Sequence, residues 1–438
     1  MSFVSHFVAP ISLSAGAGIS IGVHEDHASC MEYAANWEME NRLRAFLLGR
    51  IGRLLPRREQ RECFATYAQG IMTDGERKSV EPIAARATAD AVECSRAHGS
   101  ILHFLREAPW DDRKVRLESA SYVIEALQAQ EKVVVWIIDD TGFPKQGKHS
   151  VGVQRQYSGT LGKVGNCQVG VSLSIATRHE HVPIDFELYM PESWTEDKAR
   201  CKKARVPTDL VFKTKTELAL DLISRAMDNK IPGEIVLADA AYGGSAEFRN
   251  TVQMFGLDVG VAVKGNMKVW LLDAIERRRG EPIEARALGA QFGRAAFRRM
   301  TWREGTCRKM ASNFKFCRVK VANDDGTEVA DRQPMWLVIE WPDGESQPTK
   351  FVLTSLRRRM SKKEIVRVLQ ERWRTERAYE ELKGELGLDH FEGRTFTGWH
   401  HHISVVLCCY AFIVSERVRH FPPSARRKNQ SESVVRAA

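Results

Sequence analysis

The chain has 438 residues, of which 43% are hydrophobic and 28% are charged, so it is long enough for two or three domains and for a sizeable core. Its 65 Lys and Arg residues outnumber its 56 Asp and Glu residues, and the net charge of +9 favours a polyanionic partner. The nine Cys residues are odd in number and include no Cys-x-x-Cys pair. This pattern disfavours a disulfide scaffold and a cysteine-rich zinc site, and it indicates a reduced, cytosolic chain.

A membrane protein and a secreted protein are both disfavoured. The most apolar uncharged stretch, residues 403–415, has 13 residues, whereas a bilayer helix needs roughly 20. Residues 1–24 carry no Asp, Glu, Lys or Arg and lack the basic start and solid apolar block of a signal peptide. We expect a disordered leader over residues 1–30, or a start codon placed too early, with Met31 or Met39 as the true first residue. The basic tail over residues 421–438 is also expected to be disordered.

Residues 31–130 have the pattern of an all-α module. Apolar side chains recur at helical spacing, and further helix-like runs include residues 100–106 and 113–129. The stretch is dense in Arg and Glu, with few clusters of β-branched residues. Its Arg content and its place ahead of the first strands predict a DNA-binding module. A helical bundle that only supports dimerisation is the alternative.

The pattern changes to short strands after residue 130. Residues 133–138 and 234–238 are apolar, β-branched runs too short for helices, which predicts two buried strands. Residues 152–159 and 168–177 alternate in period two and are expected to pair with the first of these strands. Helical spacing returns at residues 213–227 and 248–255, and residues 258–263 predict another strand. The sequence therefore predicts an α/β core over residues 131–263.

Residues 264–350 predict a β-rich insertion. Strand-like runs at residues 297–302, 314–321 and 335–341 are separated by turn-prone stretches that contain Asp-Gly pairs. A helix is expected to begin at Ser361, with Glu364 in the capping-box position, and to end near residue 385. A last apolar helix is expected over about residues 399–418, so that residues 351–420 return to the core.

Two acidic segments follow the two buried strands. Asp139 and Asp140 come after the first strand, and Asp239 comes after the second. An acid at the exit of a buried strand is costly unless it is paired or binds a metal. Two such strands in one mixed sheet would bring their carboxylates to a common edge. For Asp139 and Asp140 the alternative is an Asp that caps the turn before Gly142.

The helix predicted after Ser361 carries a polar stripe. Arg372, Glu376, Tyr379 and Lys383 fall within about 60° on one helical face. A solvated ladder of salt bridges is the alternative. With the two strand-end acids, Glu376 completes a set of three carboxylates, the ligands that Mg²⁺ prefers. Two such ions can activate a nucleophile and stabilise the leaving oxygen in phosphodiester displacement.

Basic residues and histidines cluster near the same helix. Residues 355–377 contain nine Lys and Arg against three Glu, which predicts either a solvated face or a surface that contacts phosphates. His400, His401 and His402 are consecutive, so on a helix they point in different directions and cannot easily share one zinc ion. Hydrogen bonding or DNA contact is the expected role of these histidines.

The chain resembles DDE-type insertion-sequence transposases of the cut-and-paste branch, whose last acid lies in a Tyr-x2-Arg-x3-Glu-x6-Lys signature. Here Arg372-x3-Glu376-x6-Lys383 fits, and Leu369 stands at the Tyr position, which removes one phosphate contact of the family. Residues 139–157, and residues 387–394 followed by the three histidines, resemble one subgroup of that branch. The resemblance covers about residues 35–420.

The resemblance implies an α/β, ribonuclease-H-like catalytic core of a mixed sheet with flanking helices, interrupted before the glutamate by the β-rich insertion. It implies that Asp139, Asp239 and Glu376 bind two Mg²⁺ ions, with Mn²⁺ as a substitute and Asp140 as the alternative first acid. Such an enzyme cuts DNA at the transposon ends and frees a 3′-hydroxyl, which attacks target DNA in line.

The resemblance also implies double-stranded DNA as the partner, as terminal inverted repeats and as target, and a homodimer in the synaptic complex of a bacterial, nucleoid-associated protein. DNA contacts are expected from Arg372, Lys383, Lys145, Lys148 and His149. The alternatives are a ribonuclease-H-like nuclease that does not join strands and a domesticated DNA-binding protein. Intact acids at all three positions argue against a pure binding protein.

Overall fold

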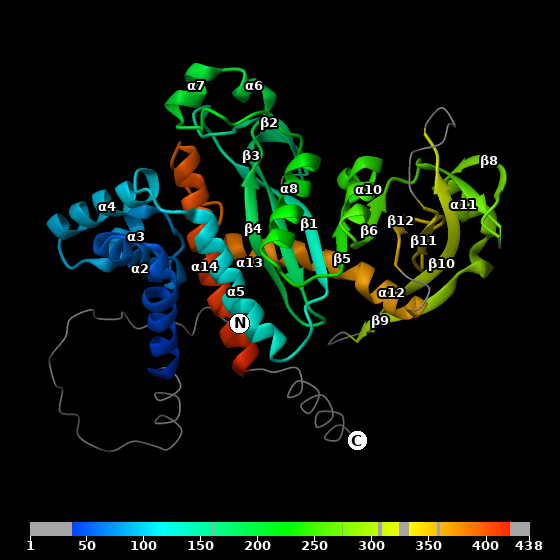
Figure 1. Ribbon diagram of the computed structural model, residues 1–438, viewed down its shortest axis with the longest axis horizontal. Coiled ribbons are helices and arrows are strands. Elements are labelled where there is room, and N and C mark those ends of the chain that lie inside the picture. Colours follow the sequence, from blue (N-terminus) through cyan, green and yellow to red (C-terminus); the bar gives the residue numbers. More distant parts are fainter. Residues whose placement is uncertain are drawn as a thin grey trace, which may run out of the picture.

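The computed structural model describes residues 37–159, 162–273, 275–304, 309–323, 333–356 and 360–420. The predicted leader over residues 1–30, the predicted tail over residues 421–438 and three arginines of the basic run at residues 357–359 lie outside these ranges. Within the described ranges the chain is a mixed α/β structure, in which one large sheet is flanked by helices (Figure 1).

The first part of the chain is helical, as predicted. Residues 37–44 are α-helical and continue into two short helical segments of other types, η2 (Ala45–Arg50) and η3 (Ile51–Leu54). Four α-helices follow: α2 (Arg58–Met72), α3 (Val80–Ala87), α4 (Ala91–Arg106) and α5 (Asp112–Gln128). The carboxylates of Asp90 and Asp111 accept backbone N–H groups at the starts of α4 and α5, which fixes where these helices begin.

The central sheet begins after these helices. Its first six strands are β1 (Val135–Pro144), β2 (Gln154–Ser158), β3 (Lys163–Ala176), β4 (His181–Leu188), β5 (Ile235–Ala238) and β6 (Asp258–Val263). They lie side by side in the order β2-β3-β1-β5-β6, and β4 also pairs with β3. Strands β1, β5 and β6 are parallel, whereas β3 is antiparallel to β1, β2 and β4. The sequence pattern did not predict β4.

Five helices connect these strands. They are α6 (Glu192–Thr195), α7 (Lys198–Lys203), α8 (Lys215–Asp228), α9 (Ala240–Gly243) and α10 (Ala246–Met254). Helices α8 and α10 match the predicted helical runs, and Thr214 and Glu217 form a capping box at the start of α8. Helices α6 and α7 were not predicted, because they are too short to show a periodic apolar pattern.

The predicted insertion is rich in strands but continues the central sheet. It contains β7 (Lys268–Leu272), β8 (Arg278–Glu284), α11 (Ala285–Phe292), η5 (Arg294–Ala296), β9 (Arg298–Glu304), β10 (Lys309–Val321) and β11 (Met335–Trp341), and β12 (Lys350–Thr354) closes it. Strand β12 pairs with β6, so the sheet of twelve strands extends through β11 and β10 to β7 and β8. In Figure 1 these strands lie at the end of the long axis opposite α2–α4.

The helix predicted over residues 361–385 is interrupted. Ser361 caps α12 (Lys362–Leu369), as predicted, but a turn of 3₁₀ helix, η6 (Gln370–Trp373), separates it from α13 (Arg374–Gly384). The last helix, α14 (Phe396–His420), is longer than predicted. By length and composition α14 could cross a membrane, but 94% of its most apolar segment is buried inside the molecule.

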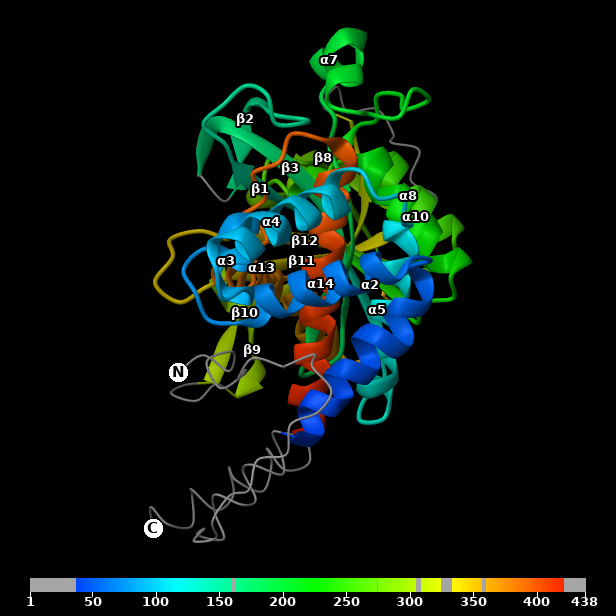
Figure 2. The same ribbon diagram turned by 90° about the vertical axis from the view of Figure 1, so that its left-hand side faces the viewer.

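Helix α14 is the centre of the packing between the N-terminal helices and the sheet. It packs against the helices α5, α2 and α4 and against strand β4. One hydrophobic cluster includes Phe46, Phe64, Val123 and Phe412, and it continues to Ile138 in the sheet. Figure 2 shows the N-terminal helices gathered around α14. The N-terminal helices therefore share their core with the rest of the molecule.

Candidate active site

The acids that follow β1 and β5 meet at one point of the sheet. The two strands are parallel, and their last pair of residues is Ile138 and Ala238. Asp139 and Asp239 are the next residues of the two strands and therefore lie side by side. The charge of Asp239 contributes to a raised pKa of Asp139, as expected for two carboxylates at one edge of the sheet. The sequence predicted this common edge, and the register of the parallel pair explains it.

Asp139 and Asp140 point to opposite faces of the sheet, as successive strand residues do. Asp139 is paired with Ser172, whose hydroxyl lies 2.5 Å from the hydroxyl of Tyr379 in α13. Paired residues of antiparallel strands share a face, so Asp139 faces α13. Asp140 instead forms an ion pair of 2.9 Å with Lys215 in α8. The helix that carries Glu376 therefore lies on the face of Asp139.

Helix α13 and the preceding turn η6 are fixed to β1 by two cations of the polar stripe. Nη1 of Arg372 lies 3.2 Å from Oδ2 of Asp139. Nζ of Lys383 donates to Oγ1 of Thr141 at 2.8 Å and to the carbonyl of Gly142 at 2.9 Å. The stripe is thus not a ladder of salt bridges in solvent, because these cations bond to the strand. Glu376, between them in sequence, is exposed.

Burial disfavours the charge of Asp139 more than its ion pair with Arg372 offsets. Burial raises the pKa of Asp139 to about 7, Arg372 opposes this rise, and the charge of Asp239 adds to it. Tyr242 lies in the same environment: burial and the charges of the three aspartates raise the pKa of its phenol. A bound cation would favour the ionised carboxylates, so Asp139 and Asp239 are suited to hold a metal ion.

No complete metal site is formed by the side chains that the structure describes. Among these residues, no three Asp, Glu, His or Cys side chains lie close enough to hold one ion. The aspartate pair supplies hard oxygen ligands of the kind that Mg²⁺ prefers, and Glu376 lies on the adjoining helix with an exposed side chain. The structure therefore brings two of the three predicted ligands together.

The turn after β5 fixes the position of Asp239. One oxygen of its carboxylate accepts the N–H groups of Ala241 and Tyr242 at the start of α9. This helix packs so closely on β6 that a Cβ atom at Gly243 would lie 1.9 Å from the carbonyl oxygen of Ala262. A glycine is therefore required at position 243, and the short helix holds Asp239 at the strand end.

The other predicted DNA-contact residues lie in different surroundings. Lys145 is partly buried, and its Nζ donates to the carbonyls of Phe391 at 2.7 Å and Asp389 at 3.3 Å. This side chain therefore joins the end of β1 to the segment before α14. Lys148 and His149 are exposed in the loop that follows, where both can reach a ligand.

The three consecutive histidines have structural partners instead of a common ligand. His400, His401 and His402 are 5%, 1% and 0% exposed, so of the two expected roles hydrogen bonding is confirmed and DNA contact is wrong. His401 stacks on Trp110 with 3.7 Å between ring centroids, and His402 lies 2.8 Å from the hydroxyl of Tyr67. His401 and His402 therefore fix two different contacts of α14.

Sequence reasoning missed two residues next to the acids. Tyr242 is 1% exposed, and within the described ranges its hydroxyl has no hydrogen-bond partner. Its place three residues after Asp239 was the only signal in the sequence. Lys215 neutralises Asp140, and nothing in its own segment predicted this contact, because the two residues are 75 positions apart.

Comparison with known proteins agrees with this geometry. A family model described as DDE superfamily endonuclease matches residues 51–309, more than half of the chain; this segment contains Asp139 and Asp239 and ends before Glu376. A curated relative, the probable transposase for insertion sequence element IS701 of Microchaete diplosiphon, is 29% identical over 212 residues. The match covers 48% of this chain and 51% of the relative, so the chain spans about half the length of that relative.

Two solved structures have a weaker likeness. The piggyBac transposase synaptic complex with hairpin DNA matches with a TM-score of 0.41 and 10% identity, over 81% of this chain and 66% of that chain. The NurA nuclease of Sulfolobus solfataricus matches with a TM-score of 0.25 and 10% identity, over 57% of this chain and 79% of that chain. On the family match and the two strand-end aspartates within it, the chain belongs to the DDE superfamily of endonucleases.

Proposed function

We propose that this protein is a DNA transposase, which cuts at transposon ends and joins the freed 3′-hydroxyl to target DNA. The observation that carries the proposal is the meeting of Asp139 and Asp239 at the ends of two parallel strands, with α13 on the face of Asp139. The curated relative is named a transposase, which supports the same function. The partner is then double-stranded DNA, bound by a homodimer when two ends are held together.

The sheet order supports a catalytic core of the ribonuclease-H-like type. We assign this core to β1, β3, β4, β5 and β6 with the helices around them, and to α12–α14 after the insertion. The insertion between β6 and α12 adds strands to the same sheet, so it lies beside the acids and separates the last of them from the others in sequence. The N-terminal helices are assigned to DNA recognition.

The donor set at the strand ends fits divalent cations. Asp139, Asp239 and Glu376 would hold two Mg²⁺ ions, or Mn²⁺ in their place, because all three offer carboxylate oxygens and because the ion pair with Arg372 offsets the burial of Asp139 only in part. When bound, such ions supply activation of the attacking oxygen and stabilisation of the leaving oxygen. Asp140 is paired with Lys215 on the other face, which supports Asp139 as the first ligand.

The protein's own residues position the substrate. Arg372 and Lys383 lie on the α13 side of the acids, and we propose that they contact the phosphates beside the bond that is cut. Ser172 and Tyr379 fix the spacing between β3 and α13. No Ser, Cys or Tyr nucleophile is needed, because water and the 3′-hydroxyl of DNA are the attacking groups.

The experiment that tests the function uses three isosteric substitutions. Asp139→Asn, Asp239→Asn and Glu376→Gln each remove a ligand charge with little change of shape, so each is expected to lower cleavage of transposon-end DNA at least 100-fold. Binding of the same DNA should stay within about twofold of wild type. The substrate is a duplex with the inverted repeat from the DNA that flanks the gene, and cleavage is measured with Mg²⁺ and with Mn²⁺.

Asp140→Asn is the matched control, since its side chain lies on the opposite face. If Asp140→Asn is inactive while Asp139→Asn cleaves normally, the first acid is Asp140. Near-normal cleavage by any one of the three variants contradicts that residue's role as a ligand. A strand-transfer assay with pre-cut ends separates a transposase from a nuclease, because only a transposase joins the 3′-hydroxyl to a second duplex.

A further inference from the structure

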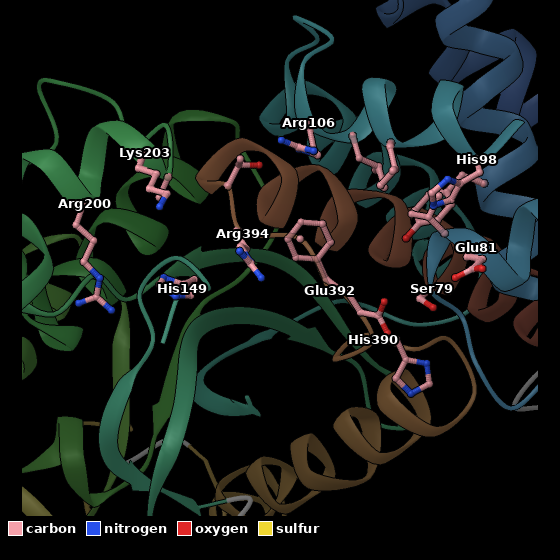
Figure 3. Close-up of a pocket in the computed structure, with 18 of the residues that line it drawn as sticks. Ser79, Glu81, His98, Arg106, His149, Arg200, Lys203, His390, Glu392 and Arg394 are labelled. Atoms are coloured by element: carbon pink, nitrogen blue, oxygen red, sulfur yellow. The ribbon is translucent and has the colours of Figure 1, made fainter. Parts of the chain in front are cut away.

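A pocket of about 490 Å³ lies between the N-terminal helices and the catalytic core. Its walls come from the loop before α3, from α3 and α4, from α7, and from residues 390–395, which precede α14 (Figure 3). None of Asp139, Asp239 and Glu376 lines it. The volume falls in the range of roughly 300–1,000 Å³ that is typical of ligand pockets.

The charge that lines this pocket is positive. Arg106 of α4, Lys203 of α7 and Arg394 of the segment before α14 are exposed, and no described residue forms a hydrogen bond or an ion pair with any of these three side chains. Figure 3 shows Lys203, Arg106 and Arg394 around the pocket, with Glu81 on its other side. We call Arg106, Lys203 and Arg394 the cation triad. Its charges attract anions, because no described carboxylate forms an ion pair with any of the three.

The segments that carry the cation triad are fixed to one another. The N–H of Phe396 donates to the carbonyl of Ala204 at 2.8 Å, which joins the segment of Arg394 to the end of α7. His401 of α14 lies 2.9 Å from the carbonyl of Leu105, directly before Arg106. The three segments that carry the cations are distant in sequence and are thus held in one arrangement by hydrogen bonds, as a preorganised binding site requires.

Two other charged residues of the lining, Arg200 and Glu392, have partners of their own. Arg200 lies over the ring of Trp194 at 3.6 Å and donates to the carbonyl of Lys148 at 2.8 Å, so its guanidinium is fixed in the wall. Glu392, one of the two carboxylates in the lining, is paired at 2.7 Å with Arg77. The charge of Glu392 is therefore balanced without the cation triad.

Strand β1 connects the pocket to the acids. From Asp139 the strand continues to Pro144, a length of roughly 17 Å at 3.4 Å per residue. The next residue, Lys145, bonds to the carbonyl of Phe391 in the lining of the pocket. Roughly 17 Å corresponds to about five base pairs of a DNA duplex. A duplex that lies along this path from the acids would bring its backbone to the cation triad.

We propose that the cation triad grips the phosphodiester backbone of the transposon end, inside the cut site, and so holds the duplex across the junction between the N-terminal helices and the core. This inference rests on the proposed function for the identity of the DNA, but the contact itself needs only a phosphate backbone. Backbone contacts carry no sequence information, so the triad fixes position and not sequence preference. His149, which also lines the pocket, is a further contact of the same kind.

The test is the salt dependence of DNA binding by the full-length chain. Arg106→Ala, Lys203→Ala and Arg394→Ala are compared with wild type on a duplex that carries the flanking inverted repeat and on a scrambled duplex of the same length. Each lost phosphate contact should lower the slope of log K against log salt by about one, and the triple variant by about three, on both duplexes. Lys202→Ala is the matched control, because Lys202 is the exposed neighbour of Lys203 on α7 and does not line the pocket. It should keep the wild-type slope.

Footprinting of the phosphates gives a second, independent result. Wild type should protect phosphates about five base pairs or more inside the cut, and the triple variant should lose this protection while it keeps protection at the cut itself. A wild-type slope and footprint in a folded triple variant would overturn the proposal. If the triple variant behaves like wild type in this way and wild type cuts and joins ends, the proposed function stands and only the role of the cation triad fails. If wild type shows no cleavage but the triad variants change the salt slope as expected, the contact between the cation triad and DNA phosphates stands and the proposed function fails.

Discussion

Both ring nitrogens of the buried His402 have hydrogen-bond partners when the ring is neutral. Its Nδ1 lies 2.8 Å from the hydroxyl of Tyr67 and its Nε2 lies 3.1 Å from the carbonyl of Gly387. A neutral ring fits both contacts, since Nε2–H donates to the carbonyl and Nδ1 accepts from the hydroxyl. Burial lowers the pKa of His402 from 6.5 to about 3, which agrees with the neutral ring.

This residue makes the stability of the protein depend on pH. The unfolded chain takes up the proton below pH 6.5, whereas the folded chain takes it up only near pH 3, so the stability is complete above pH 6.5 and decreases as the pH falls between these values. From pH 6.5 to pH 5 the loss from this residue is about 2 kcal/mol. We expect the unfolding free energy of His402→Gln, measured by denaturant titration, to depend less on pH over this interval.

The control for the pH experiment is His103→Gln, since His103 is exposed on α4. This variant should keep the pH dependence of wild type. If His402→Gln also loses as much stability as wild type between pH 6.5 and pH 5, then His402 is not the group that resists protonation.

At the scale of elements, the position of α13 on β1 decides what the polar stripe can do. Arg372 bonds to Asp139, Lys383 bonds to Thr141 and Gly142, and the exposed Glu376 lies between them in sequence. The ammonium group of Lys383 is partly buried, and this burial lowers its pKa. Two roles remain for the cations: they hold α13 against the strand, or they contact phosphates at the cut.

The two roles differ in the salt dependence of DNA binding. If Arg372 and Lys383 contact phosphates, Arg372→Ala and Lys383→Ala should each lower cleavage and flatten the slope of log K against log salt by about one. Arg377→Ala is the control on the same helix, because Arg377 is 71% exposed and pairs with Glu381. A lower melting temperature with an unchanged slope in either variant would assign that residue to the support of α13 alone.

At the scale of the whole molecule, a buried ionic network joins the N-terminal helices to the core. Arg116 of α5 is 2% exposed and bonds to Asp112 at 2.5 Å, to Asp185 of β4 at 2.7 Å and to Ser404 of α14 at 2.9 Å. Arg225 of α8 also bonds to Asp185, at 2.8 Å. Through Arg116 and Asp185 the network joins α5, β4 and α8 to α14. The N-terminal helices are therefore fixed relative to the acids, as the proposed grip on DNA requires.

Removal of Arg116 should destabilise the whole chain. Arg116→Met keeps most of the apolar volume but leaves the partly buried carboxylates of Asp112 and Asp185 with less positive charge, which costs up to about 3–5 kcal/mol of unfolding free energy. Arg113→Met is the matched control: Arg113 bonds to Glu187 at 3.0 Å but is 60% exposed, so its loss should cost at most about 1 kcal/mol. Equal losses in the two variants, measured by denaturant titration, would contradict the difference between buried and exposed pairs.

Much of the local structure could be predicted from the sequence. Residues 258–263 and 335–341 are strands with the predicted bounds, because their apolar, β-branched pattern fits buried strands. Ser361 caps α12 as predicted, since its hydroxyl accepts the N–H of Glu364. The meeting of Asp139 and Asp239 was also predictable, because both follow short buried strands, which are parallel and adjacent in the sheet.

The sequence by itself therefore determined the strands, the positions of the acids at their ends and the family to which these motifs point. Only the tertiary structure decided what each polar side chain contacts, because partners such as Lys215 and Asp140, or Arg116 and Ser404, are separated by 75 and 288 positions. It also showed that the three histidines are buried, since a helix pattern does not reveal how many neighbours surround α14. The cation triad exists only in the fold, because its three residues come from segments that local sequence patterns cannot relate to one another.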